Sequence, residues 1–344
     1  MTAALEVGRY SRQELFAGLG REGQERIRRA RVLVVGAGAL GSALAEMMTR
    51  AGVAALTLVD RDYVEASNLQ RQSLYDESDA ARALPKAIAA EAKLRAINSD
   101  VEVRGLVADL AADNAPGILR GHGLVLDGTD NFETRFLVND LCVREGIPWV
   151  YGACVGAYGL ALAVRPRVSP CLRCVLEERP EPGSGPTCDT AGVIAPIVHV
   201  VAGIQGGEAL KLIAERHDAL FPGVVTVDLW SGLFSVMDLR DRKPSCPACT
   251  LGCFEHAQAI GAGPSTVLCG RDAVQVRPAP GSTLDLAALA ERLSAAGPVQ
   301  RNEHLLRFAA PTAELVVFRD GRAIVKGVKD AAEARSLYAR YVGN

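Results

Sequence analysis

The chain has 344 residues, of which 49% are apolar, with a formal net charge of −2 and a pI of about 6.3. This length is too great for one average domain and short for three, and the apolar fraction is enough for a large buried core. The near-neutral charge gives no general basic surface and argues against a nucleic-acid partner. The chain starts without a basic apolar leader, and its uncharged stretch 191–207 falls short of the roughly 20 apolar residues of a membrane span. We therefore expect a soluble, cytoplasmic protein without membrane contact.

The most informative run is residues 32–72, which opens with the apolar strand 32–35 and the loop Gly36-Ala37-Gly38-Ala39-Leu40-Gly41. A helical pattern at 42–50 and a second strand, 56–60, follow. In such a unit the first glycine permits a tight turn, the second lets the backbone approach a phosphate, and the helix N-terminus offers unpaired N–H groups. Asp60 lies 19 residues beyond Gly41, where a carboxylate can accept hydrogen bonds from a ribose. The loop alone points first to NAD or FAD and leaves ATP open.

Strands and helices continue to alternate up to about residue 152. We predict strands at 101–107, 124–127 and 149–151, and helices at 85–97, 113–120 and 132–144. This alternation predicts an α/β fold with a mostly parallel, Rossmann-like sheet covered on both faces. Three later strand-like runs, at 160–164, 224–229 and 234–239, predict a mixed or antiparallel extension of that sheet. The segment 177–190, rich in Pro and Gly, predicts a mobile loop.

The C-terminal part is predicted to be a separate small α+β module. We place a first domain at 1–255, a linker at 256–266, where Gly261, Gly263 and Pro264 break the pattern, and the module at 267–344. The module shows helical patterns at 284–295 and 330–341 and a strand pair, 315–318 and 322–326. Asp320-Gly321 between these strands favours the turn of a hairpin. Its role is open between partner docking and simple stabilisation.

The nine cysteines include two C-x-x-C pairs, Cys171–Cys174 and Cys246–Cys249. In a cytosolic chain of this size such pairs bind a metal more often than they form disulfides. The 72 positions from Cys174 to Cys246 are too many for spacing alone to prove one site, so free thiols stay open. Cys253 is near enough to replace Cys249.

Seven motifs in one order make residues 6–252 resemble the ThiF/MoeB adenylyltransferases, relatives of ubiquitin-activating enzymes that activate ubiquitin-like sulfur carriers. They are Arg9-Tyr10-Ser11-Arg12-Gln13, GAGALG at 36–41, LVDRDYVEASNLQRQ at 58–72, Pro85-Lys86, LVLDGTDN at 124–131, the two C-x-x-C pairs, and TCDTAGVIAP at 187–196.

The resemblance implies an enzyme that uses ATP and Mg²⁺ to adenylylate the C-terminal glycine of a ThiS- or MoaD-like carrier ending in Gly-Gly. The product is then converted to a thiocarboxylate for thiamine or molybdenum cofactor biosynthesis or for tRNA thiolation. A homodimer and a cysteine desulfurase or other persulfide donor are implied as partners. Since two anions must approach each other, neutralisation by cations should be the main catalytic effect. The C-terminal extension favours the thiamine type.

The resemblance also assigns roles to individual residues. Arg71 and Lys86 would contact the triphosphate, Asp130 would hold Mg²⁺ or its waters, and Arg12 resembles an arginine finger supplied across the dimer. Cys188 would form a thioester or acyl-disulfide with the carrier, the alternative being an ordinary small residue. The implied ATP-binding residues are Gly36, Gly38, Ala39, Gly41, Asp60, Asp62, Asn68, Arg71, Gln72, Lys86, Asp130 and Asn131. The implied structural zinc ligands are Cys171, Cys174, Cys246 and Cys249.

Two departures from the family pattern stand out. Ala39 replaces a usual glycine, and Ala83-Leu84 stands where the family often has Gly-Gln. The rival functions are an NAD- or FAD-dependent oxidoreductase, a non-catalytic binding module, and the same ATP chemistry on tRNA. The first leaves the basic residues and cysteine pairs unexplained, the second conflicts with the retained catalytic residues, and the mildly acidic balance and the cysteines weigh against the third.

Overall fold

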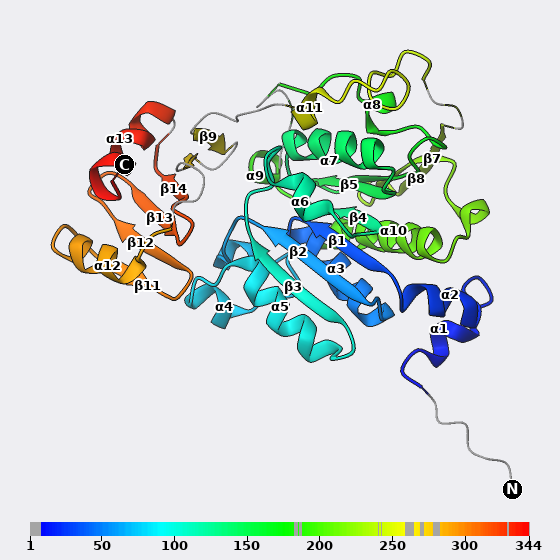
Figure 1. Cartoon of the computed structure of the whole chain (residues 1–344), viewed down its shortest axis with the longest axis horizontal. Helices are drawn as coiled ribbons and strands as arrows, with labels where there is room; N and C mark the ends of the chain where they lie inside the picture. The colour runs from blue at the N-terminus through cyan, green and yellow to red at the C-terminus, as the bar shows by residue number, and fades with distance from the viewer. Residues whose placement is uncertain are drawn as a thin grey trace, which may run out of the picture.

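The computed structural model describes residues 8–181, 185, 188–239, 241, 243–258, 265–268, 272–277, 283–328 and 330–343, without the side chains of 188–189 and 265–268. The chain forms a large α/β domain with a smaller sheet and its helices at one end (Figure 1). The large sheet has eight strands in the order β3-β2-β1-β4-β5-β6-β7-β8. The predicted α/β fold, mostly parallel with an antiparallel extension and a further small module, is confirmed.

The parallel part of the large sheet is made by its first five strands, and the remaining three run antiparallel. The parallel strands are β1 (Arg31–Val35), β2 (Ala55–Asp60), β3 (Glu102–Val107), β4 (Leu124–Asp127) and β5 (Trp149–Val155). The antiparallel strands are β6 (Tyr158–Val164), β7 (Gly223–Asp228) and β8 (Leu233–Asp238). Strand β4 is buried along its whole length and β1 is exposed only at Arg31. Burial on both faces accounts for the apolar run of β4 before Asp127 and for that of β1 after Arg31.

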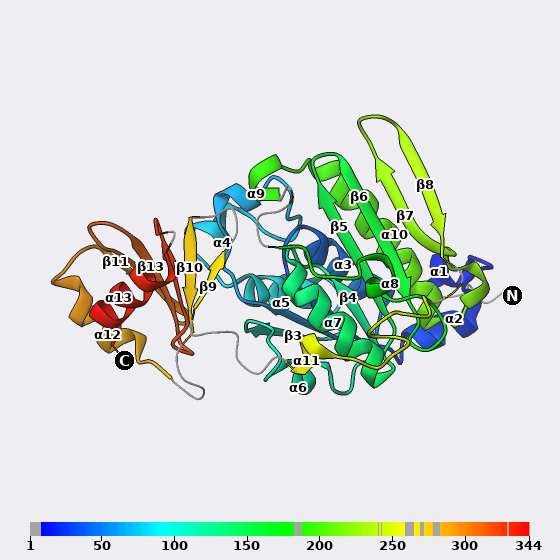
Figure 2. The same ribbon diagram turned by 90° about the horizontal axis from the view of Figure 1, so that it is seen from above.

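Helices cover both faces of this sheet (Figure 2). One layer is α3 (Ala39–Ala51), α5 (Lys86–Ile97) and α10 (Ala195–Ile213). The other is α6 (Ala115–Leu119) and α7 (Phe132–Glu145), with α8 (Leu172–Val175) and α11 (Glu255–Gln258) outside α7. Shorter helices are α1 (Ser11–Leu15), α2 (Gly20–Ile27), η1 (Ala66–Asn68), α4 (Glu77–Ala81), α9 (Cys188–Ala191) and η2 (His217–Ala219). Among the described residues, no helix has the length and apolar character needed to cross a membrane.

The second sheet is antiparallel, with six strands in the order β11-β12-β13-β14-β10-β9. Its strands are β9 (Ser265–Leu268), β10 (Ala273–Val276), β11 (Val299–Arg301), β12 (Leu305–Ala309), β13 (Glu314–Phe318) and β14 (Ala323–Lys326). Helices α12 (Leu286–Ser294) and α13 (Ala331–Tyr341) cover one face. The predicted β13–β14 hairpin is present, and Gly321 takes φ +83° in its turn.

Most predicted elements of the large domain match within a few residues, whereas α1, α2 and strands β9 to β12 were not predicted. The predicted mobile loop 177–190 ends in the backbone of α9, and its residues 182–184 and 186–187 lie outside the described residues. Helix α11 occupies the start of the predicted linker 256–266, of which residues 259–264 also lie outside them. The domain boundaries stay a prediction.

Candidate nucleotide site and cysteine cluster

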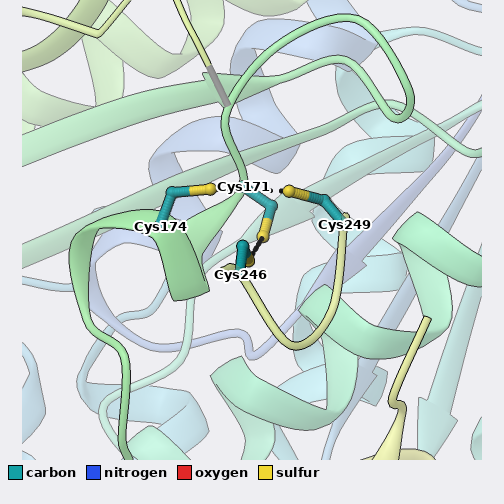
Figure 3. Close-up of side chains that lie close together, drawn as sticks. All are labelled: Cys171, Cys174, Cys246 and Cys249. Carbon is teal, nitrogen blue, oxygen red and sulfur yellow. Dashed lines mark hydrogen bonds between the residues drawn. The ribbon is translucent and has the colours of Figure 1, made fainter. Parts of the chain in front are cut away.

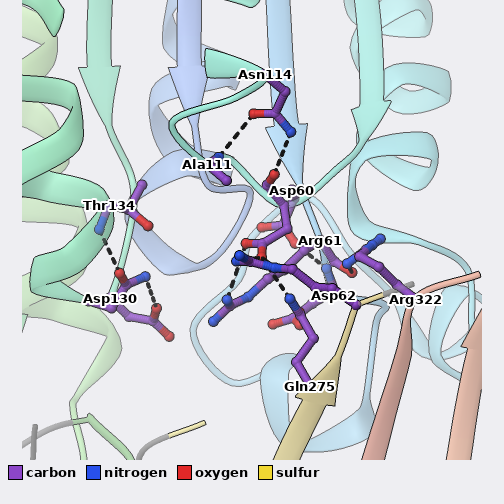
Figure 4. A network of polar contacts seen from close by, with 12 residues as sticks. Asp60, Arg61, Asp62, Ala111, Asn114, Asp130, Thr134, Gln275 and Arg322 are labelled. Carbon is purple, nitrogen blue, oxygen red and sulfur yellow. Dashed lines mark hydrogen bonds and ion pairs between the residues drawn. The ribbon is translucent and has the colours of Figure 1, made fainter. Parts of the chain in front are cut away.

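The loops that follow the parallel strands meet at one edge of the large sheet. The glycine loop follows β1, residues 61–72 follow β2, and residues 128–131 follow β4. Lys86 begins α5 beside them and lies 3.4 Å (Nζ to Oδ2) from Asp62. Figure 4 shows Asp60 at the end of β2, Asp62 just beyond it, and Asp130 in the loop after β4, all at this edge of the sheet. The carboxyl edge of parallel strands is where such sheets bind nucleotides, and every predicted ATP-binding residue lies on these segments.

Three glycine backbones pack directly against one another at the start of α3. Gly36 takes φ +87°, and an added Cβ there would lie 2.7 Å from the Gly128 carbonyl oxygen. A Cβ on Gly41 would lie 1.8 Å from the Gly36 oxygen, and one on Gly128 would lie 2.6 Å from the Gly41 Cα. Gly128 was not predicted, although it stands in the LVLDGTDN motif. Ala39 is the first residue of α3 and does not have a positive φ. Alanine therefore fits there without strain.

Asp60 is a partly buried carboxylate that connects two of the loops. Its Oδ2 accepts the Ala37 N–H at 2.6 Å, and its Oδ1 accepts the Asp62 N–H at 2.6 Å. Burial raises the pKa of Asp60, and the nearby Lys86 ammonium opposes that rise. Each carboxylate oxygen can accept more than one hydrogen bond. The structure therefore shows Asp60 bracing the glycine loop, while its contact with a ribose stays a prediction.

Tyr75, which was not predicted, joins the glycine loop to the start of α5. Its hydroxyl lies 2.8 Å from the carbonyl oxygen of Ala37 and 3.2 Å from that of Lys86. Burial, together with the charges of Asp60 and Asp79, raises the pKa of Tyr75 well above its usual value, so the phenol stays a proton donor. No sequence pattern around Tyr75 marks such a bridge.

The segment after Asp62 holds its predicted residues in three different ways. Asn68 is buried, and its Oδ1 accepts the Glu65 N–H at 3.1 Å, which fixes the turn of η1. Arg71 Nη1 donates to the Ser67 carbonyl oxygen at 2.8 Å. Gln72 is also buried, its Nε2 is 3.9 Å from the position of a Cβ on Gly38, and its Oε1 has no hydrogen-bond partner among the described residues. A buried acceptor of this kind beside the glycine loop suits a polar ligand.

The loop after β4 depends on an ion pair that sequence analysis did not find. Arg135 Nε lies 3.2 Å from Asp127 Oδ2, and both side chains are buried. Arg135 Nη2 also donates to the carbonyl oxygens of Thr129 at 2.7 Å and Gly152 at 3.2 Å. Burial raises the pKa of Asp127, and Arg135 opposes that rise. The pair holds the loop that presents the exposed carboxylate of Asp130. A carboxylate oxygen is a ligand that a hydrated Mg²⁺ accepts.

Asn131 and Arg12 occupy opposite ends of the domain. Asn131 caps α7, its Oδ1 accepting the Thr134 N–H at 2.9 Å. Arg12 lies on α1, where the neighbouring Gln13 Nε2 donates to the Ala51 carbonyl oxygen at the C-terminal end of α3. Because the glycine loop is at the other end of α3, Arg12 is not part of the site in its own chain. Its role across a dimer stays a prediction.

The backbone of Cys188 begins α9, beside the end of β5. An isolated bridge between Gly156 and Val193 fixes the chain just beyond α9 to the residue after β5. Since β5 is parallel to β4, this places the start of α9 at the same edge as the glycine loop. The Cys188 side chain lies outside the described part of the structure, so its covalent role stays a prediction.

The four cysteines of the two C-x-x-C pairs come together in one cluster (Figure 3). Cys171 Sγ is 3.6 Å from Cys246 Sγ, Cys174 Sγ is 3.4 Å from Cys249 Sγ, and all four sulfur atoms lie within 4.8 Å of one another. A tetrahedral ion with Zn–S bonds of about 2.3 Å would place its sulfur ligands about 3.8 Å apart. The donor set and spacing fit such an ion. Cys253 is exposed and is not part of the cluster.

The cluster lies away from the glycine loop, on the outer side of α7 (Figure 1). Helix α8, which carries Cys174, is attached to α7 by the Leu172 N–H, which donates to Asn139 Oδ1 at 3.0 Å. The cluster thus connects the excursion after β6 with the segment after β8. A site with four thiolate ligands and no open position has a structural use.

The glycine loop and the polar residues gathered at the carboxyl edge of its parallel strands have the arrangement of a nucleotide-binding α/β protein. The chain belongs to the ThiF family, whose model matches residues 10–248.

Among its relatives, the sulfur carrier protein ThiS adenylyltransferase of Bacillus subtilis (strain 168) is 47% identical over 339 residues, which are 98% of this chain and 100% of that protein. The SAMP-activating enzyme E1 of Haloferax volcanii is 40% identical, covering 75% of this chain and 94% of that protein. The sulfur carrier protein adenylyltransferase of Thermus thermophilus is also 40% identical, covering 71% of this chain and 91% of that protein. The crystal structure of E. coli MccB with MccA-N7isoASN has a TM-score of 0.63 at 19% identity, covering 72% of this chain and 76% of that one, which shows the shared fold.

Replacing Gly128 by Ala is expected to lower the free energy of unfolding by about 1–3 kcal/mol, the usual cost of overpacking. The added Cβ meets backbone atoms of Gly36 and Gly41, which have no side chain to rotate away. ATP affinity should fall as well, because the glycine loop must move. Calorimetric unfolding and titration with ATP measure both. Gly117→Ala is the control, since its Cβ meets nothing within 4 Å. Equal stability and equal affinity in Gly128→Ala and wild type would contradict the packing argument.

Proposed function

We propose that this chain adenylylates the C-terminal glycine of a ThiS-like sulfur-carrier protein. The observation that carries the proposal is the near-complete match to the ThiS adenylyltransferase of B. subtilis, which includes the C-terminal sheet. The H. volcanii and T. thermophilus relatives match only about three quarters of the chain. This difference favours the thiamine pathway over molybdenum cofactor synthesis and tRNA thiolation.

In the proposed reaction, a carboxylate oxygen of the carrier glycine attacks the α-phosphorus of ATP and pyrophosphate leaves. The glycine loop and the N-terminus of α3 offer backbone N–H groups to the phosphates. Arg71 and Lys86 neutralise the charge of the triphosphate and of the approaching carboxylate, which otherwise repel each other. Lys86 is already desolvated and held by Asp62, so it needs little reorganisation. Asp130 would hold Mg²⁺, which supplies further neutralisation of the phosphates.

A protein substrate is supported by an exposed apolar surface on the β7–β8 hairpin. The hairpin projects beyond the helices at the edge of the sheet (Figure 2), and β8 is the last strand of that sheet among the described residues. Its exposed apolar side chains are Leu229, Trp230, Leu233, Phe234 and Met237, and Trp230 is 85% exposed. Such a concentration of large apolar side chains marks a protein-binding surface. It suits the carrier's folded body, while the flexible tail enters the nucleotide site.

We also propose a homodimer in which Arg12 acts on the partner's phosphates. Leu15 and Phe16, three and four residues after Arg12, are 72% and 65% exposed, which supports a protein contact at α1. A cysteine desulfurase or another persulfide donor would supply sulfur after adenylylation. The cytoplasm is the proposed location, because it offers ATP and a reducing environment for free thiols.

Carrier-dependent exchange between ATP and pyrophosphate tests the function. We expect exchange with a ThiS-like carrier and none with the same carrier lacking its terminal glycines. Arg71→Ala and Lys86→Ala should each slow exchange by roughly 10²–10³-fold, the usual loss for one group that stabilises developing charge. Arg50→Ala is the matched control, since Arg50 is exposed and its ion pair in the described part of the chain is with Glu46 on the same helix, α3. If no carrier stimulates exchange, the proposed function is wrong, and tRNA substrates become the next test.

A further test concerns Cys188, which we propose as the residue that holds the carrier covalently during sulfur transfer. Cys188→Ser is expected to keep ATP–pyrophosphate exchange near the wild-type rate and to abolish thiocarboxylate formation with a persulfide donor. Mass spectrometry of the carrier measures the second reaction. Cys142→Ser is the control, because Cys142 is buried in α7 and its thiol pKa is raised by burial. Loss of exchange in Cys188→Ser would contradict the assignment.

We propose that the cysteine cluster binds one structural Zn²⁺. Cobalt in its place should give the near-ultraviolet absorption of a thiolate-bound ion, and Cys171→Ser should lose it. Cys253→Ser should keep it, because Cys253 lies outside the cluster. Removal of the metal by a chelator should lower the melting temperature, since metal binding contributes to folding. An unchanged cobalt spectrum in Cys171→Ser would exclude this site.

A further inference from the structure

The C-terminal sheet packs directly against the segments that flank the nucleotide site. One apolar contact layer joins Tyr63 and Ala83 of the large domain to Leu305, Phe318 and other residues of the smaller sheet. Tyr63 belongs to the segment after β2, and Ala83 to the loop that leads to Lys86. The module is therefore in contact with both segments that carry the acidic and basic nucleotide-binding residues.

At the same boundary, one buried carboxylate is held by residues from both parts of the chain. Asp109, in the loop after β3, lies 3.2 Å (Oδ1) from Arg61 Nη1. Its Oδ2 accepts hydrogen bonds from Gln275 Nε2 at 2.6 Å and from Arg277 Nε at 3.0 Å. Burial alone would raise the pKa of Asp109, but Arg61 and Arg277 hold it below its usual value, so Asp109 remains charged.

The loop that carries Asp109 is itself fixed. Asn114 Nδ2 donates to the Asp109 carbonyl oxygen at 2.8 Å, and Asn114 Oδ1 accepts the Ala111 N–H at 2.9 Å. The Ala108 N–H donates to the carbonyl oxygen of Asp60 at 3.0 Å. The backbone of Asp109 is therefore fixed, and its carboxylate in turn fixes the position of the Arg61 guanidinium.

Arg61 stands between the two acidic residues of the nucleotide site. Its carbonyl oxygen accepts a hydrogen bond from Arg322 Nη1 at 3.2 Å, so the C-terminal sheet holds its backbone as well. Figure 4 shows Gln275 and Arg322 reaching this segment from that sheet. A shift of Arg61 would move both of its neighbours in the chain, of which Asp60 braces the glycine loop and Asp62 pairs with Lys86.

We propose that Asp109 is a positioning residue for nucleotide binding, held in place by Gln275 and Arg277 of the C-terminal module and acting through Arg61. The inference rests on the proposed function, because it concerns the same ATP site. Asp109 does not contact the nucleotide. It fixes the carboxylates next to Arg61, and the C-terminal module thereby becomes part of the nucleotide site.

The test uses Asp109→Asn, which keeps the shape of the side chain and removes its charge, in the full-length enzyme. We expect the KM for ATP in carrier-dependent exchange, and the Kd for ATP by calorimetry, to rise about tenfold, the scale of one charge-assisted hydrogen bond. The kcat should change less than about twofold, because the ground state and the transition state lose the same interaction. Arg277→Ala should give a similar rise, and Arg277→Lys should recover part of it. In the double variant Asp109→Asn/Arg277→Ala, KM and Kd for ATP should rise no further than in either single variant. Both substitutions remove the same contact, so their effects should not add.

Arg292→Ala is the matched control. Arg292 Nη2 donates to the carbonyl oxygens of Tyr341 and Val342 inside the module, and none of its hydrogen bonds to described residues reaches the site. It should lower the melting temperature without changing the Kd for ATP. If Asp109→Asn and Arg277→Ala lower the melting temperature but leave KM and Kd unchanged, the cluster only stabilises the fold and the proposal is overturned.

The calorimetric measurement of Kd for ATP tests this proposal independently of the proposed function. A wild type that binds ATP but exchanges no pyrophosphate with any carrier would refute the function, while the Kd values of the variants would still decide the role of Asp109. If Asp109→Asn fails to fold, Arg277→Lys and Arg277→Ala decide it, since each keeps the apolar layer and the Arg322 contact. A wild type without ATP binding would overturn both.

Discussion

The partly buried carboxylate of Asp60 is the constraint on which the nucleotide site depends. A charge removed from water is tolerated only when hydrogen bonds and nearby opposite charge stabilise it. Here the hydrogen bonds come from the N–H groups of Ala37 in the glycine loop and Asp62 in the next segment. The Asp60 carbonyl oxygen accepts a third N–H, from the loop after β3. The glycine loop and the segment after β2 must therefore take one mutual arrangement before the carboxylate is satisfied, and the loop after β3 is fixed to the backbone of the same residue.

Each loop of the site is also held from behind by a group that binds no substrate. Gly128 supports the glycine loop by backbone contact, and Arg135 holds the loop that carries Asp130. Tyr75 joins the glycine loop to the helix that begins with Lys86. Electrostatic catalysis requires charged groups that are oriented before the substrate arrives, since reorganisation during the reaction would raise the barrier. These supports explain how loops on the surface of a sheet can meet that requirement.

The sequence allowed prediction of those features that local pattern determines. Buried parallel strands such as β4 are continuous apolar runs, and the glycine loop and C-x-x-C pairs are short motifs. Tyr75, Arg135 and Asp109 could not be found, because their roles depend on partners from other elements, and a single tyrosine, arginine or aspartate in a loop or helix carries no such signal. Strands β9 to β12 were missed for a related reason. They are as short as β13 and β14, but no Asp-Gly turn separates them as it separates that pair, and they become strands through pairing across the sheet.

The unusual Ala83-Leu84 pair becomes intelligible once the C-terminal sheet is in place. Ala83 takes φ +47°, a conformation that glycine adopts without steric cost. A residue with a Cβ is destabilised there by roughly 1–2 kcal/mol. The module offsets this cost. Asn302 Nδ2 lies 2.9 and 3.2 Å from the carbonyl oxygens of Arg82 and Ala83, and the Ala83 side chain is buried in the apolar layer against the sheet. A glycine would relieve the strain but lose that contact. The contacts from the module to Arg82 and Ala83 thus fix the path of the chain into Lys86.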